Sequence, residues 1–372
     1  MILENIKKLI NKVLKLFEKY SHIFSSFGLV LGLIVTPITL QRIDNFGENL
    51  WIILHLFIAI FGIFVLNFLD NKINAGKIDK QYQNSIIFWS TLVIQFAFGN
   101  LFSTYIIFYF KSSSLSTSWP FILLILFILI GNEIWKKHYS RLVMQVSTLF
   151  LSIYMFIIFF LPIIIHRIGD DIFIYSGITS LFITGIIIFA LWKITKEKFI
   201  KSKKALLFSI LGTFVFINIF YFLNIIPPIP ISLKEAGVYY SVTKDPSGFY
   251  ILEEKKKDWT DFFKITDVFE RYNNEPIYFF SAIFSPTKFD TYITHEWNHY
   301  DKKLKKWINV NKINLPIVGG RDNGYRTYSL KSNITEDLWE VKVKTKNNRV
   351  VGRVRFEVKN VTQKPVVEFV NI

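Results

Sequence analysis

One five-residue stretch has the residue types of a zinc-dependent hydrolase. Residues 295–299 read His-Glu-Trp-Asn-His and match the H-E-x-x-H string, in which two histidines bind zinc and the glutamate acts as a base. This chemistry requires a helix, because residues four positions apart then share one face, whereas on a strand their Cα atoms would lie roughly 13 Å apart. The apolar residues of 293–307 also fit helical spacing, so the local pattern leaves both structures open.

Other features of the sequence weaken the zinc interpretation. No later segment offers a third ligand, and the chain contains no cysteine. The lack of cysteine excludes disulfides, thiolate metal sites and cysteine nucleophiles. We therefore predict no metal, no cofactor and no catalytic residue in this chain, which we interpret as a non-enzymatic protein.

A second candidate is the charged side of a predicted hairpin near the C-terminus. Apolar and charged residues alternate along 338–345 and 350–358, and two asparagines at 347–348 suit a two-residue turn. This register places Lys342 opposite Arg353 on the polar side. It also places Glu340 opposite Arg355.

The basic ribbon on this hairpin suits an anionic partner, although exposed strand faces are often charged without any function. The candidate partner-binding residues are Lys342, Arg353, Arg355, Arg326 and Tyr328. We expect an envelope glycan, an anionic polymer or a protein as the partner. Nucleic acid is not expected, because no recognisable module combines a basic stripe with stacking aromatic residues.

Polar residues within apolar stretches form a third group of candidates, because buried ionisable groups in a membrane are often functional. Glu133 is the one acidic residue well inside a predicted span, although it could simply pair with lysines three and four positions later. Asn100 belongs to a polar stripe that hydrogen bonding between helices would also explain. The alternative function is thus a membrane-embedded enzyme or transporter acting on lipid-linked substrates.

The elements that carry these residues divide the chain into two parts. Of its 372 residues 51% are hydrophobic, and the apolar runs are concentrated before about residue 226. Seven runs have the length of about 20 residues that spans a bilayer. They lie near 22–43, 49–69, 86–110, 115–135, 142–165, 172–192 and 205–226. Residues 1–21 predict a basic amphipathic helix that lies on the membrane or leads into the first span.

The distribution of Lys and Arg predicts the orientation of the spans. With the N-terminus in the cytoplasm, the cytoplasmic segments hold seventeen of these residues and the three outer loops hold one each. Positive residues remain on the cytoplasmic side, so the seventh span should deliver the C-terminus outside a bacterial cytoplasmic membrane. The excess of positive charge in the membrane part therefore reflects topology first.

The remaining residues predict a separate β domain. Residues 227–234 form a proline-rich tether, and 235–372 show short alternating runs separated by turn signals. Residues 277–284 are apolar on both faces and predict a central strand, whereas 259–272 suit a short helix. We expect an antiparallel β-sandwich, with the immunoglobulin type as one form.

Several motifs resemble a known family. In the membrane part they are Thr39–Asp44, Phe98–Ser103, Phe108–Leu115, Ser118–Phe121 and Gly131–Glu133. In the C-terminal part they are His295-x-Trp297, Gly319–Arg321, Gly324–Ser329, Trp339-x-Val341, Gly352 and Phe356. Together they resemble bacterial polytopic membrane proteins that end in the domain of unknown function numbered twenty-nine-fourteen.

The resemblance implies a seven-span module with this domain attached, and it implies no activity. It singles out Lys111 and Glu133 as family positions. It also makes His295 and Trp297 the family feature of the H-E-x-x-H stretch, with His299 incidental.

Overall fold

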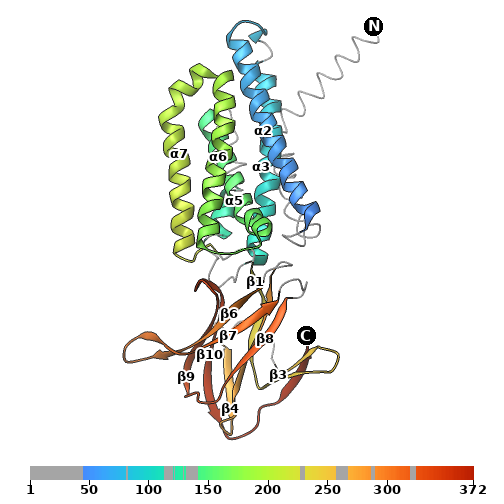
Figure 1. Ribbon diagram of the computed structural model, residues 1–372, viewed down its shortest axis with the longest axis vertical. Helices are drawn as coiled ribbons and strands as arrows, with labels where there is room; N and C mark the ends of the chain where they lie inside the picture. The colour runs from blue at the N-terminus through green and yellow to red at the C-terminus, as the bar shows by residue number, and fades with distance from the viewer. Residues whose placement is uncertain are drawn as a thin grey trace. The chain divides into compact units, whose positions relative to one another are not determined.

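The protein is described from a computed structural model. The structure describes residues 45–80, 83–112, 120, 122–128, 130, 141–226, 231–256, 267–285, 290–318 and 324–372. The described chain separates into a helical unit and a β-rich unit, drawn in Figure 1.

The helical unit contains long apolar helices. Within the described residues, five of them are long and apolar enough to cross a membrane. They are α2 (Phe46–Asn74), α3 (Gln83–Ser112), α5 (Leu142–Ile165), α6 (Asp170–Ile194) and α7 (Lys196–Phe222). These helices match the second, third, fifth, sixth and seventh predicted spans. The first predicted span, 22–43, and most of the fourth, 115–135, lie outside the described residues, so the count of seven stays a prediction.

Local signals set the helix ends. The side-chain oxygen of Asn45 accepts the Gly47 N–H at 3.0 Å and caps α2, with Glu48 in the first turn and Lys72 in the last. The start of α7 lies nine residues earlier than predicted, because the lysine-rich segment 196–204 is also helical. Hydropathy locates the apolar part of a helix and not its solvated first turns.

Buried polar side chains join the helices of this unit. The Asn67 amide on α2 donates to the Gln145 side-chain oxygen on α5 at 2.6 Å, and both residues are buried. The Tyr105 hydroxyl on α3 donates to the backbone oxygen of Ser152 on α5 at 2.7 Å. Hydrogen bonds between helices stabilise their packing in a membrane, where apolar contact alone provides little driving force for association.

The β-rich unit contains three sheets (Figure 1). The first has the order β1-β5-β8, with β1 at Ser232–Tyr239, β5 at Ile277–Phe284 and β8 at Tyr325–Lys331. The second has the order β4-β10-β9-β6-β7, with β4 at Asp267–Tyr272, β6 at Asp290–Asp301, β7 at Lys306–Val318, β9 at Asp337–Thr345 and β10 at Val350–Val361. The third has the order β11-β3-β2, with β2 at Ser241–Lys244, β3 at Tyr250–Lys255 and β11 at Val367–Asn371.

This arrangement confirms a β-rich C-terminal domain and corrects two details. The β4–β10 pair is parallel, so the sheets are not wholly antiparallel. The helix predicted over 259–272 is wrong for its last part, because 267–272 form β4. The aromatic and β-branched residues of that segment favour a strand once β10 supplies a partner. The immunoglobulin type stays a prediction.

The core lies against β5, as its two apolar faces predict. This strand pairs with β1 and β8, and seven of its eight residues are buried. Phe279 and Ile283 of β5 belong to one apolar cluster with Trp297, Val341 and Phe356 of the five-stranded sheet. The five-stranded sheet therefore has an inner face in the core and an outer face that carries polar residues.

The last hairpin has the predicted register but not the predicted turn. Arg353 pairs with Lys342 and Arg355 with Glu340, as expected. The Thr345 N–H donates to the Arg349 oxygen at 2.8 Å, which encloses three residues and not two, and Asn348 has φ of +62°. A shift between Val350 and Gly352 then restores the register. The hydrophobic pattern determines the register, since a one-residue slip would expose the apolar set.

Candidate functional site

The H-E-x-x-H stretch lies on a strand. Residues 295–299 belong to β6, so the helix that the zinc chemistry requires is not formed. His295 is buried in the core, whereas His299 lies beside Trp339 with ring centroids 5.0 Å apart and the ring planes tilted. Alternation along the strand sends Glu296 to the outer face, away from His295. The strand interpretation is therefore the one that the structure bears out.

His295 is the centre of a buried hydrogen-bond cluster. Its Nε2 lies 2.9 Å from the Ser281 hydroxyl and its Nδ1 lies 2.9 Å from the Ser329 hydroxyl. The Trp297 indole N–H also donates to Ser329, at 3.2 Å. Burial lowers the pKa of His295 to about 3, so the imidazole is neutral at physiological pH. This cluster joins β5, β6 and β8 and is a structural feature of the core.

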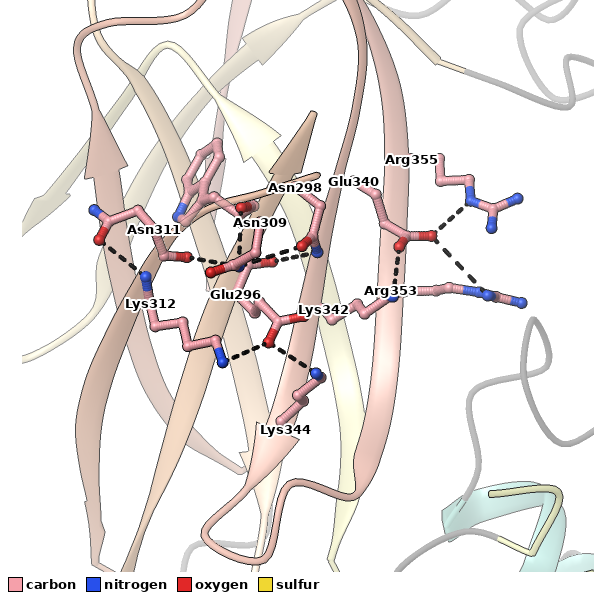
Figure 2. Close-up of polar contacts among 11 residues, drawn as sticks. Glu296, Asn298, Asn309, Asn311, Lys312, Glu340, Lys342, Lys344, Arg353 and Arg355 are labelled. Carbon is pink, nitrogen blue, oxygen red and sulfur yellow. Dashed lines mark hydrogen bonds and ion pairs between the residues drawn. The ribbon is translucent and has the colours of Figure 1, made fainter. Parts of the chain in front are cut away.

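The charged face is the second feature, on the outer side of the five-stranded sheet (Figure 2). It gathers two carboxylates and five cations from four adjacent strands. Its residues are Glu296, Lys312, Glu340, Lys342, Lys344, Arg353 and Arg355. Cations therefore exceed carboxylates on this face.

Glu340 is fully buried beneath three cations. The Arg355 Nε donates to its Oε2 at 2.7 Å, and the Arg353 guanidinium lies 4.0 Å from the same atom. The Lys342 ammonium lies 3.1 Å from Oε1. The predicted ribbon thus exists, and a carboxylate beneath it offsets the repulsion between its like charges.

Glu296 holds the remaining lysines of the face. The Lys344 ammonium donates to Glu296 Oε2 at 2.8 Å, and the Lys312 ammonium lies 3.5 Å from the same atom. Burial alone would raise the pKa of Glu296, but the hydrogen bond from Lys344 and the charges of Lys344, Lys312 and Lys342 lower it below its ordinary value. The carboxylate is therefore ionised, and its Oε2 pairs with two lysines.

A bulge in β7, at Val310, brings asparagine side chains beside the charged face. The pairing shifts between Trp297 and Asn298, and Asn298 then lies opposite Asn309 of β7. The Asn309 amide nitrogen lies 3.3 Å from the Asn298 side-chain oxygen, which is a long hydrogen bond. Bulges often re-aim side chains near functional sites. Here the bulge places the exposed Asn309 amide beside the buried Asn298, next to Glu296 (Figure 2).

Aromatic rings close one end of the same face. Tyr300 and Trp307 are cross-strand partners with ring centroids 5.2 Å apart. The Arg355 guanidinium lies 5.3 Å from the centre of the Trp307 ring. Cations, amides and aromatic rings therefore lie together on one side of the sheet.

The other candidate residues lie elsewhere. Arg326 and Tyr328 are on β8 of the three-stranded sheet, opposite Ala282 and Phe280 of β5, and not on the charged face. On α3 the Asn100 amide donates to the Phe96 backbone oxygen at 3.0 Å, an ordinary bond within a helix. Glu133 and the side chain of Lys111 lie outside the described residues.

The sequence analysis missed Glu296, Lys312 and Lys344 as members of the face. The alternation of 294, 296 and 298 with buried positions could have placed Glu296 on the outer side of a strand. Nothing local indicates that β6 lies beside β9. Asp70 was also missed: it is buried on α2 and forms an ion pair with Lys198 of α7. The predicted span had ended one residue before it.

Comparison with known families bears on the segment that holds the charged face. Residues 290–358 match the family model described as "Protein of unknown function (DUF2914)". The C-terminal domain is a DUF2914 domain. The match runs from the start of β6 to near the end of β10 and includes the seven residues of the charged face.

The remaining comparisons add little to this DUF2914 assignment. No curated protein matches the chain. Among solved structures, the Pseudomonas fluorescens alkylpurine DNA glycosylase AlkC, bound to DNA containing an abasic site analog, aligns with 84% of this chain and 99% of its own. The identity is 9% and the TM-score is 0.21, too low to support a common fold.

Proposed function

We propose that this chain is a non-enzymatic multi-pass protein of the bacterial cytoplasmic membrane whose extracytoplasmic DUF2914 domain binds an anionic polymer of the cell envelope. The observation that carries the proposal is the excess of cations on the charged face. Five cations surround two carboxylates there, and Glu340 and Glu296 are both buried beneath them. The cationic groups are thus the part of the face that a ligand would meet first.

The order of residues across the sheet favours a linear ligand. Lys312, Glu296, Lys342 and Arg353 are cross-strand neighbours on β7, β6, β9 and β10. Because adjacent strands lie about 4.8 Å apart, this row extends over about 14 Å. Lys312 and Lys342 lie two strands apart, a spacing that suits repeated negative charges along an extended chain.

The neighbouring side chains favour a glycan among anionic polymers. The exposed Asn309 amide can donate to and accept from sugar hydroxyls. The Tyr300 and Trp307 pair offers apolar ring surface with polar edges at the end of the same face. An acidic polysaccharide presents carboxylates, hydroxyls and flat ring faces together, so it meets all three groups.

We expect the full chain in zwitterionic nanodiscs to bind a carboxylated polysaccharide such as hyaluronan and not neutral dextran. Replacing Lys312, Lys342 and Arg353 with Gln should weaken binding about tenfold or more, since each exposed charge pair contributes up to about 1 kcal/mol. The variant keeps Arg355 and Lys344, which are the closest cations to the two carboxylates. Biolayer interferometry at low and high salt measures the change, and the parent's affinity should fall with salt.

The matched control for this test replaces three exposed lysines outside the face. Lys244, Lys256 and Lys364 are exposed, and their exchange for Gln removes the same net charge. The control variant should bind like the parent. Equal losses in both variants, or no binding by the parent, would contradict the charged face as a binding site.

The proposal also predicts the side of the membrane on which the β domain lies. A reporter fused at Ile372 should be active outside the cytoplasm, because the loop charges place the N-terminus inside and an odd number of spans follows. Paired alkaline phosphatase and green fluorescent protein fusions measure this. Fluorescence with no phosphatase activity would overturn the proposed topology.

A further inference from the structure

The turn between β6 and β7 carries an exposed apolar residue among lysines. This hairpin tip, residues 301–307, reads Asp-Lys-Lys-Leu-Lys-Lys-Trp. Leu304 at its centre is 58% exposed. Lys302 pairs with Asp337 at 2.6 Å, while Lys303, Lys305 and Lys306 form no ion pair with the residues that the structure describes. Three cations around one apolar side chain are thus available to a partner.

The hairpin tip is ordered by its own hydrogen bonds. The Asp301 carboxylate accepts the backbone N–H groups of Lys303 and Leu304 at 2.8 and 2.9 Å. Lys305 adopts φ of +49°, which closes the turn. The Lys302–Asp337 pair joins this turn to the start of β9. Leu304 is therefore held outward by a preformed loop, so little conformational entropy would be lost on binding.

The tip also extends past the neighbouring strand. β6 pairs with β9 only as far as His299, whereas Tyr300 and Asp301 pair only with β7. Ile308 and Val310, at the base of the tip, are exposed as well. Figure 1 shows this hairpin projecting from the sheet. The projecting end therefore combines apolar side chains with a cluster of lysines.

We propose that the hairpin tip binds an anionic lipid surface, with Leu304 in the interfacial region and Lys303, Lys305 and Lys306 on headgroup phosphates. A leucine surrounded by lysines fits this environment, because the apolar side chain leaves water while long basic side chains keep their charges among the headgroups. An anionic polymer in solution would use the charges but gain nothing from Leu304. This inference is independent of the polymer site on the charged face.

The length of the connecting chain supports a lipid partner. Only nine residues, 223–231, separate the end of α7 at Phe222 from the start of β1 at Ser232. That segment can span at most about 36 Å when fully extended. The β domain thus remains near the bilayer that α7 enters, so lipid has a high effective concentration and weak contacts are enough for binding.

The lack of cysteine makes a direct test simple. A Leu304→Cys variant of the full chain can carry one environment-sensitive NBD label, and nanodiscs can hold either phosphatidylcholine alone or phosphatidylcholine with phosphatidylglycerol. The matched control is Val366→Cys, because Val366 is apolar, 74% exposed and on a different part of the β-rich unit. Replacing Lys303, Lys305 and Lys306 with Gln in the labelled Leu304→Cys chain tests the role of charge.

The expected result is a blue shift and a gain in emission from the label at 304 in anionic nanodiscs only. The shift should be lost at high salt and in the triple lysine variant, and the label at 366 should not respond. A label at 304 that stays in water in anionic nanodiscs would overturn the inference. So would a shift that needs hyaluronan and occurs equally in neutral nanodiscs, since the tip would then belong to a polymer site.

Discussion

Replacing His295 with alanine should lower the free energy of unfolding of the β-rich unit by about 3–5 kcal/mol. His295 is fully buried, packs edge-on against Phe279 with centroids 4.8 Å apart, and bonds both Ser281 and Ser329. Its loss would leave a cavity and deprive two buried hydroxyls of a partner. Urea unfolding of the purified full chain, followed by hydrogen exchange in β5, β6 and β8, measures the change.

The control for this prediction is His299→Ala on the same strand. His299 is partly exposed and contacts Trp339 and Asp337 at longer range, 5.0 and 3.9 Å. Its removal should cost less than about 1 kcal/mol, as for most partly exposed positions. Similar losses of unfolding free energy in both variants would show that the buried hydrogen-bond cluster stabilises the fold no more than the partly exposed His299 does.

The same histidine makes stability depend on pH. The folded-state pKa of His295 is about 3, below its ordinary value of 6.5, so the unfolded chain takes up the proton first as pH falls. The contribution of neutral His295 to the free energy of unfolding is therefore fully present above pH 6.5. It is lost as pH falls from 6.5 toward 3, by about 1.4 kcal/mol per pH unit. A His295→Gln variant should lack this slope between pH 6 and 5, and an unchanged slope would contradict the assignment.

The second large effect should come from Glu340. Replacing it with alanine should destabilise the β-rich unit by about 3–5 kcal/mol, because Lys342, Arg353 and Arg355 would lose their common carboxylate. Adding Arg355→Met to this variant should restore part of the loss, since one of the unpaired cations is then removed. Urea unfolding of the full chain and of both variants gives these differences.

Glu357 is the matched control for Glu340. It lies on β10, and its carboxylate is 3.5 Å from the Lys359 ammonium in an exposed pair. Glu357→Ala should change the free energy of unfolding by less than about 1 kcal/mol, the range of surface pairs. If Glu340→Ala proved equally mild, Glu340 would not be the carboxylate that holds the cations of the charged face together.

Much of the architecture could be predicted from the sequence, because hydropathy and alternation are local properties. Runs of about 20 apolar residues indicated the five spanning helices that the structure describes. The two apolar faces of β5 indicated a central strand. The register that pairs Lys342 with Arg353 was also predicted, since only that register keeps Val341 and Val354 on the inner face together.

What the sequence could not predict depends on contacts between distant segments. The turn at Asn348 was predicted one residue too short, because a later shift near Val350 compensates for its extra residue. β4 was predicted as helix, because its partner strand β10 lies about 90 residues later. Local preference alone is a weak guide for such strands, whose stability comes from cross-strand neighbours.

The sequence by itself determined that this is a chain of apolar spanning helices followed by a β-rich domain with a basic hairpin. Only the tertiary structure decided that β6 lies beside β9, which brings Glu296 next to Lys344 and completes the charged face. Only it decided that His295 lies in the core, bonded to serines 14 and 34 positions away. The physical reason is that spanning length and alternation act within a segment, whereas strand order and burial depend on the energy of the whole fold.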